Sequence, residues 1–236
     1  MILTSFFGSL YQRAYALNTA NIVSALKSTG PHSRLLDVGC WDGAQTRVWH
    51  QIAGANKTFG IEPVASAAKQ AARLGIRTAR ISADRNRWPY KSDFFDCIVS
   101  NQVIEHLSHL DHFLSEASRV LKPGGILITS TNNLSSWHNI FALILGWAPF
   151  DLANSSIRIL GLGNPWSIHY GKSDIRGSSW THKCVYTSHW LRVWLDLYGL
   201  ETIKIMGAGY YPLPATIGKW FPLHSAFITL ISQKKQ

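Results

Sequence analysis

Hydrophobic positions along the chain follow two patterns. In the first part, apolar side chains recur three or four positions apart from Leu10 to Leu26, and the run ends at Gly30-Pro31. This spacing predicts a helical lead-in over residues 1–30. From residue 34 onward, short apolar runs alternate with longer helical stretches. That alternation is typical of βαβ units, so it predicts an α/β fold with a parallel sheet.

Short apolar runs predict the first five strands of this sheet. They are Arg34–Val38, Lys57–Ile61, Ile76–Ile81, Asp96–Ser100 and Gly125–Ser130. Helices fit between them, and the clearest is Leu110–Leu121, whose apolar positions share one face. The turn Lys122–Gly125, which contains proline and two glycines, is expected to end that helix.

The alternation breaks after Ser130. Residues 131–186 are rich in Trp, Asn, Gly and Ser, and long irregular insertions of this kind usually carry function, so we expect a cap on the substrate side. A helix over Thr187–Tyr198 and two strands, Thr202–Met206 and Ala226–Ser232, follow, with an aromatic loop between the strands. At 236 residues the chain buries one sizeable core, which predicts a single domain over 1–236.

The most informative segment is Leu35–Gly43, an apolar strand that runs straight into a turn. Gly39 and Gly43 lack side chains, so backbone can approach a ligand at the carboxyl end of the first strand. Asp37 and Asp42 bring carboxylates to the same place, where they would repel a pyrophosphate. They suit a cationic ligand such as S-adenosylmethionine, which carries a sulfonium and an ammonium. A nicotinamide dehydrogenase is therefore the weakest alternative.

A further acid ends the second strand, in Gly60-Ile61-Glu62-Pro63. A carboxylate at this position can accept hydrogen bonds from both hydroxyls of a ribose. Together with the turn after the first strand, Glu62 predicts a nucleoside-containing ligand.

The run from residue 34 to 130 resembles the class I S-adenosylmethionine-dependent methyltransferases, in the style of the branch that includes ubiquinone and menaquinone biosynthesis enzymes. The matching segments, in order, are LLDVGCWDG, GIEP, ISAD, DFFDCIVSNQVIEHL and SEASRVLKPGGILITS. The resemblance implies a Rossmann-like sheet of seven strands, mostly parallel with an antiparallel last strand. It also implies helices on both faces and the cap over the carboxyl ends of the strands.

The resemblance assigns a cofactor site for S-adenosylmethionine, with S-adenosylhomocysteine as product. Its residues are Asp37, Gly39, Cys40, Gly43, Glu62, Asp84 and Asn101. The glycine turn with Asp37 would hold the methionine end, Glu62 the ribose and Asp84 the adenine amino group. Asn101 would lie by the amino-acid moiety and the transferring methyl. Arg85–Arg87 departs from the family's usual acidic and apolar stretch, which leaves the adenine contact open.

Methyl transfer from a sulfonium is an in-line displacement, so a hydroxyl acceptor also needs a group that removes its proton. His106, just beyond the fourth strand, is the preferred catalytic base, because imidazole titrates near physiological pH. His138, after the fifth strand, is the second candidate. Both could instead be structural. The cap adds residues that could contact an acceptor: His169, Tyr170, Trp180, His182 and Lys183.

Small-RNA 2′-O-methyltransferases and some quinone-pathway O-methyltransferases hold a divalent metal with a related ExxEH run. This chain has Gln102 where the first acid should be, and a neutral amide is a poorer Mg²⁺ ligand than a carboxylate. We therefore predict no metal.

Charge and composition limit the kinds of partner that can be expected. The formal net charge is +10, which attracts anions, but the basic residues are scattered and no long basic arm appears, so a nucleic-acid partner is not expected. Three widely spaced cysteines fit a reducing compartment, and the N-terminus does not read as a signal peptide. The longest apolar stretch, Ile140–Phe150, is too short to span a bilayer. We expect a cytoplasmic protein, with peripheral membrane contact left open.

A second, shorter resemblance concerns Trp137–Trp147, which is similar to a segment of methyltransferases associated with polysaccharide and glycolipid assembly. It implies a sugar hydroxyl or lipid-linked acceptor at an acidic membrane surface. The leading prediction is O-methylation of a small-molecule or glycan- or lipid-linked hydroxyl. The alternatives are a small-molecule N- or C-methyltransferase, an RNA methyltransferase and a non-catalytic cofactor-binding partner. The sequence names neither the acceptor atom nor the oligomeric state.

Overall fold

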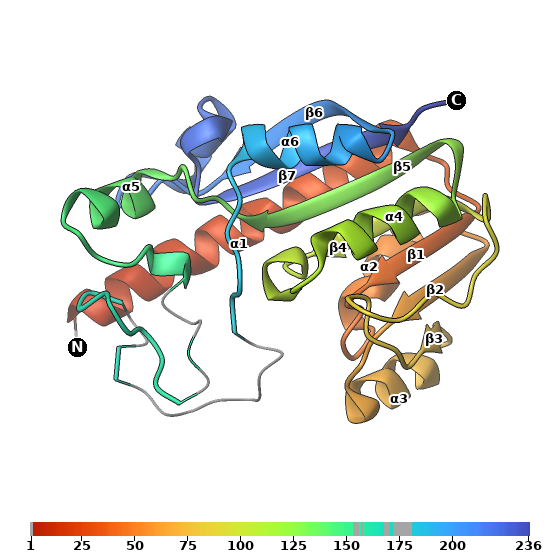
Figure 1. The fold of residues 1–236 in the computed structure, drawn as a ribbon, viewed down its shortest axis with the longest axis horizontal. Helices are drawn as coiled ribbons and strands as arrows, with labels where there is room; N and C mark the ends of the chain where they lie inside the picture. The colour runs from red at the N-terminus through yellow and green to blue at the C-terminus, as the bar shows by residue number, and fades with distance from the viewer. Residues whose placement is uncertain (1, 153–155, 157, 168–169, 172–180) are drawn as a thin grey trace.

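A computed structural model describes residues 2–152, 156, 158–167, 170–171 and 181–236 (Figure 1). Its strands are β1 (Arg34–Val38), β2 (Lys57–Ile61), β3 (Arg77–Ala79), β4 (Phe95–Asn101), β5 (Leu121–Asn132), β6 (Leu200–Ala208) and β7 (Phe227–Lys234). The α-helices are α1 (Ile2–Thr29), α2 (Ala44–Ala53), α3 (Ala65–Arg73), α4 (Leu110–Val120), α5 (Trp137–Ile144) and α6 (Ser188–Leu197). Short 3-10 turns are η1 (Ile104–His106), η2 (Phe150–Leu152), η4 (Ala215–Lys219) and η5 (Pro222–His224).

The strands form one sheet of seven in the order β3-β2-β1-β4-β5-β7-β6. β1 to β5 pair in parallel, whereas β7 is antiparallel to both β5 and β6. The predicted fold class, with its antiparallel last strand, is confirmed. The carboxyl ends of β1, β2 and β4 meet at one edge, which is where an open α/β sheet places its ligand.

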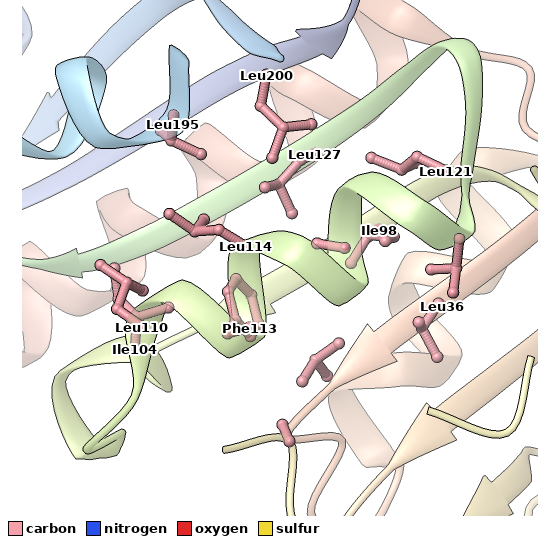
Figure 2. Packing of buried hydrophobic residues seen from close by; sticks show 14 of the residues in the cluster. Leu36, Ile98, Ile104, Leu110, Phe113, Leu114, Leu121, Leu127, Leu195 and Leu200 are labelled. Carbon is pink, nitrogen blue, oxygen red and sulfur yellow. The ribbon is translucent and has the colours of Figure 1, made fainter. Parts of the chain in front are cut away.

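Helices cover both faces of the sheet. Because side chains alternate along a strand, Leu35 packs with α1 and α2 on one face, while Leu36 packs with α4 and α6 on the other. Figure 2 shows the second face, where Phe113 and Leu114 of α4 belong to one buried cluster with Leu127 of β5. Strands buried on both faces appear in sequence as the continuous apolar runs noted above.

The start of β5 differs from the sequence prediction. The strand begins at Leu121, which pairs with Phe95, and it continues through the Lys122–Gly125 segment that was expected to be a turn. The chain still bends there, because Gly124 has a φ of +75° and the register shifts between the pairs of Phe95 and Cys97. Pairing of Leu121 with the neighbouring strand therefore outweighs the local turn signal.

The cap predicted for residues 131–186 leaves and rejoins the sheet at adjacent points. Asn133 forms a parallel bridge with Tyr186, and the Leu134 amide donates to the Tyr186 carbonyl at 3.0 Å. Between these points the chain forms α5 and η2, and His169 and Trp180 lie outside the described residues. No helix in the described part of the chain has the length and apolar character needed to cross a membrane.

Candidate active site

The turn after β1 is packed too tightly for side chains at its two glycines. Gly39 has a φ of +78°, and a Cβ built on it would lie 2.4 Å from Cγ2 of Val103. Gly43 has a φ of +82°, and its Cβ would lie 2.8 Å from the Cα of Ala71. The Gly39 amide donates to the Ile61 carbonyl at 2.8 Å, which joins the ends of β1 and β2. The glycines thus let this turn fold closely onto the residues beneath it.

Asp37 is buried directly beneath the turn, with 4% of its surface exposed. Burial raises the pKa of its carboxyl to about 7, although the Thr46 hydroxyl donates to Oδ2 at 2.7 Å and favours the ionised form. A cation placed against this carboxylate would recover the cost of ionising it. The geometry therefore suits the positively charged methionine end of the cofactor.

Glu62 presents its carboxylate at the end of β2. Oε1 accepts from the Val64 amide at 2.8 Å and Oε2 from the Trp41 amide at 3.1 Å. Burial raises the pKa of Glu62, and these two amides oppose the effect. Each carboxylate oxygen can accept a second hydrogen bond, so the fixed carboxylate can receive both hydroxyls of a ribose.

Cys40 and Asp84 both have structural contacts that the sequence did not indicate. The Cys40 thiol packs against Ala71 and Ile76 beneath the turn, so a cofactor contact at this residue would involve its backbone. Asp84 Oδ1 accepts from the amides of Ser108 and His109 at 2.8 and 2.7 Å, which joins this loop to the start of α4. Their roles toward the cofactor stay predictions.

Asn101, at the end of β4, is positioned by α1. Its Oδ1 accepts from the Asn18 amide at 3.1 Å, and Asn18 in turn accepts from the Ser130 hydroxyl at 2.6 Å. The next residue, Gln102, has a φ of +55°, and its buried Nε2 has no hydrogen-bond partner among the described residues. Strained backbone and unpaired buried polar atoms are concentrated at ligand sites, which marks Gln102 as a site residue that the prediction missed.

His106 lies in η1, three residues after the Val103 side chain that packs on Gly39. Its Nδ1 lies 3.1 Å from the Thr181 carbonyl. Since a carbonyl only accepts, Nδ1 carries the proton and Nε2 presents a lone pair. Burial, the largest influence, lowers the pKa of His106. The structure therefore favours a neutral imidazole at His106, near the glycine turn that is predicted to hold the methionine end of the cofactor.

Glu105 and His182 surround this imidazole. Glu105 is fully buried, and its Oε2 accepts from the Thr131 hydroxyl at 2.9 Å, while Oε1 has no partner among the described residues. The His182 ring lies 4.8 Å from that of His106, centroid to centroid. One ligand atom from each of Glu105, His106 and His182 falls within a 4.8 Å cluster, so these three residues could hold a divalent metal.

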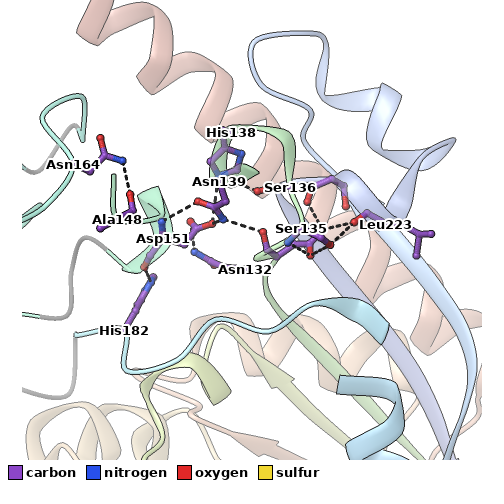
Figure 3. A network of polar contacts seen from close by, with 12 residues as sticks. Asn132, Ser135, Ser136, His138, Asn139, Ala148, Asp151, Asn164, His182 and Leu223 are labelled. Atoms are coloured by element: carbon purple, nitrogen blue, oxygen red, sulfur yellow. Dashed lines mark hydrogen bonds and ion pairs between the residues drawn. The ribbon is translucent and has the colours of Figure 1, made fainter. Parts of the chain in front are cut away.

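His138 belongs to a second polar network, built around Asp151 (Figure 3). The Asp151 carboxylate accepts from the side-chain amides of Asn132 and Asn139, both at 2.6 Å, and lies 3.4 Å from His138 Nε2. Interaction with His138 and Asn139 holds the pKa of Asp151 below its usual range in spite of burial. Tyr211, whose ring lies 5.1 Å from that of His138, keeps its buried hydroxyl unpaired within the described residues.

Asp151 joins the two histidine groups. Its carboxylate contacts His138, while its backbone carbonyl accepts from His182 Nδ1 at 2.6 Å. The two predicted bases, His106 and His138, are thus linked through His182 and Asp151. Asp151 itself carried no signal in the sequence.

Comparison with known proteins gives a consistent family. Residues 9–205 match the family described as a methyltransferase domain. A ubiquinone biosynthesis O-methyltransferase from Bradyrhizobium sp. is 31% identical over 117 residues, which is 48% of this chain and 45% of that protein. The chain therefore matches less than half the length of this relative.

Solved structures agree on the fold. A Haloferax volcanii methyltransferase in complex with its Trm112 activator has a TM-score of 0.64 at 13% identity, covering 98% of this chain and 94% of that one. A Thermotoga maritima S-adenosylmethionine-dependent methyltransferase has a TM-score of 0.60 at 19% identity, covering 99% and 98%. Identities this low establish the architecture and leave the acceptor undetermined.

Proposed function

Because the chain belongs to the methyltransferase domain family, we propose that it moves the methyl group of S-adenosylmethionine to a hydroxyl oxygen of a small, glycan-linked or lipid-linked acceptor. The observation that carries the proposal is the position of His106. It lies in the same turn as Val103, which packs on the predicted cofactor glycine Gly39, and its Nδ1 contact with the Thr181 carbonyl leaves Nε2 as the nitrogen that would accept a proton. Relatives named as O-methyltransferases support the choice of an oxygen acceptor.

The residues present fit the cofactor. S-adenosylmethionine supplies an electrophilic methyl on its sulfonium. Asp37 would oppose the charge of the methionine end, Glu62 would accept from the ribose hydroxyls, and Asn101 would lie beside the amino-acid moiety. The Nε2 of Gln102, which has no partner in the described part of the chain, is a donor that a bound carboxylate would satisfy.

For this reaction the protein must align the acceptor oxygen with the methyl group and remove one proton from the acceptor. With S-adenosylmethionine bound, the acceptor oxygen would take the methyl in line as the bond from sulfur to methyl breaks, with S-adenosylhomocysteine as leaving group. His106 Nε2 takes the hydroxyl proton, while the Thr181 carbonyl keeps the ring oriented through Nδ1. The neighbouring carboxylate of Glu105 stabilises the imidazolium that forms.

The second candidate base is His138, because its contact with Asp151 resembles the acid-histidine pairs that orient a catalytic imidazole. A third arrangement makes Glu105, His106 and His182 ligands of a divalent metal, in which case His106 would not act as base. A nitrogen or carbon acceptor would need neither. These arrangements predict different responses to substitution and to chelation.

The first experiment is calorimetric binding of S-adenosylmethionine and S-adenosylhomocysteine to the wild type and to Glu62→Ala. Binding that weakens in the variant supports the cofactor site, and folded wild-type protein that binds neither ligand overturns it. A screen of phenols and sugars with the wild type, His106→Asn and His138→Asn then tests the acceptor class. Loss of transfer in His106→Asn with unchanged cofactor affinity supports the proposed base.

The proposal also covers the cell compartment of the protein and the class of its acceptor. Cys40, Cys97 and Cys184 are free, as expected in a reducing compartment, and we propose a cytoplasmic protein that acts on a small-molecule or glycan-type acceptor. A nucleic-acid acceptor would instead show strong, salt-dependent RNA binding, which a shift assay at two salt concentrations detects.

A further inference from the structure

Helix α5 has two opposite faces. Its inner side buries Asn139 and Ala142 completely, and Asn139 donates to Asp151. Its outer side carries large apolar residues that stay exposed, with Phe141 at 43% and Ile144 at 77%. Exposing several large apolar side chains together to water is unfavourable, so such a cluster indicates a site where another molecule binds.

The exposed surface continues from α5 onto two neighbouring segments. Trp166 is 64% exposed and stacks on Phe141 with ring centroids 5.8 Å apart. At the other end of the helix, Trp137 lies 5.0 Å from the His224 ring and also donates to the Tyr210 hydroxyl. These contacts join α5 to the segment between β6 and β7, which lies at the same end of the molecule in Figure 1.

That segment adds exposed aromatic residues, with Trp220 at 76% and Phe221 at 56%. We call the whole surface the apolar face. It is formed by Trp137, Phe141, Ile144, Trp166, Trp220 and Phe221.

The exposed charges in the segments that form the apolar face are all positive. Within the described residues 137–152, 158–167 and 210–224, the one carboxylate is Asp151, which is occupied by Asn132, Asn139 and His138. The exposed charged side chains in those ranges are Arg158 and Lys219, both positive. Tryptophan is the residue that favours a membrane interface, and a flanking cation favours anionic headgroups.

We propose that the apolar face docks on the surface of a bilayer that contains anionic lipids. The aromatic rings would lie at headgroup level, with Arg158 and Lys219 against phosphates. The same helix that faces the lipid carries His138 and Asn139 on its inner side (Figure 3). If methyl transfer is as proposed above, docking places the acceptor side of the site next to the membrane. The docking itself does not depend on that reaction.

The test is flotation of the full chain with vesicles of phosphatidylcholine alone and of phosphatidylcholine mixed with phosphatidylglycerol. The variant is the pair Ile144→Glu with Trp220→Glu, which removes apolar contact and adds charge of the wrong sign. A matched control is Leu197→Glu on α6, because Leu197 is 76% exposed and lies outside the apolar face. Both substituted positions are exposed, and circular dichroism with thermal unfolding checks that each variant is folded.

The wild type and Leu197→Glu are expected to float with the anionic vesicles, and the double variant to partition at least about tenfold less. Equal binding to both kinds of vesicle would overturn the assignment to anionic lipid. Absence of flotation, or flotation that the double variant keeps, would overturn the docking surface. Self-association that the double variant abolishes, without vesicle binding, would instead make this face a contact between copies. None of these outcomes depends on methyl transfer.

Discussion

Asp37→Asn should make the protein more stable and at the same time unable to bind its cofactor well. The buried carboxyl of Asp37 has a pKa raised to about 7 from a reference value of 3.8. In the unfolded chain it ionises near the reference value. Between those two pH values the folded state therefore holds a proton that the unfolded state has lost, so stability falls as pH rises across this window.

The size of the effect follows from the shift. Three pKa units correspond to about 4 kcal/mol, which the wild type loses by pH 8 and retains at pH 4. The asparagine has nearly the same shape, and its carbonyl oxygen can still accept from Thr46. The variant should then exceed the wild type by up to about 4 kcal/mol at pH 8, or a Tm about 10 °C higher for a chain of this length. The difference should vanish near pH 4.

Two assays check the argument. Urea unfolding of both proteins without cofactor, at pH 8 and at pH 4.5, measures the stability difference. Calorimetry measures cofactor affinity, which in the wild type should fall about tenfold per pH unit below pH 7, because the cation binds the ionised form. Thr46→Val removes the hydrogen bond that favours the carboxylate, so it should move this midpoint to higher pH.

Two results would contradict this prediction: an Asp37→Asn variant that is less stable than the wild type at pH 8, or a gain in stability that is the same at both pH values. Either result would mean that Asp37 carries no buried charge at neutral pH. Cofactor affinity equal to that of the wild type would separately remove Asp37 from the binding site.

The other predictions concern the same end of the sheet. Glu62→Gln should weaken S-adenosylmethionine binding by at least about tenfold in calorimetry, because an amide cannot accept at both positions; unchanged affinity would remove the ribose contact. Gly39→Ala should cost about 1–3 kcal/mol more than Gly75→Ala in urea unfolding, since both glycines have positive φ but only Gly39 meets Val103; equal costs would contradict the steric argument. His106→Asn should slow transfer about a hundredfold or more without changing cofactor affinity, and wild-type activity should survive a chelator. Activity lost to chelation and restored by an added divalent ion would favour the metal arrangement instead.

The cofactor half of the site was predictable because it is local. Asp37 lies near the carboxyl end of β1 and Glu62 directly follows β2. Parallel pairing fixes where these strand ends meet, so short motifs carry the three-dimensional information. The family and the fold expected from those motifs are confirmed. The boundaries of β5 were less accessible, because pairing of Leu121 with Phe95 is a contact between distant residues that a local turn signal cannot reveal.

The acceptor half was not predictable because its contacts join residues that lie far apart in the sequence. His182 reaches His106 only because the cap returns to the sheet beside Asn133. Asn18 reaches Asn101 because α1 packs on the face of the sheet that also buries Leu35. Neither contact has a local spacing rule. Gln102 is a partial exception, since its departure from the ExxEH run was visible, but the strained backbone that marks it as a site residue was not.

Asp151 determines how the competing bases can be distinguished. Its carboxylate contacts His138 and is held by Asn132 at the end of β5, while its carbonyl fixes His182 beside His106. Substituting Asp151 would thus disturb both histidine groups and the fold of the cap, so loss of activity in such a variant would not identify either base. The informative variants are His106→Asn and His138→Asn, singly and together. If one histidine alone takes the proton, the double variant should be no slower than the slower single variant, because the second substitution removes nothing that the reaction uses.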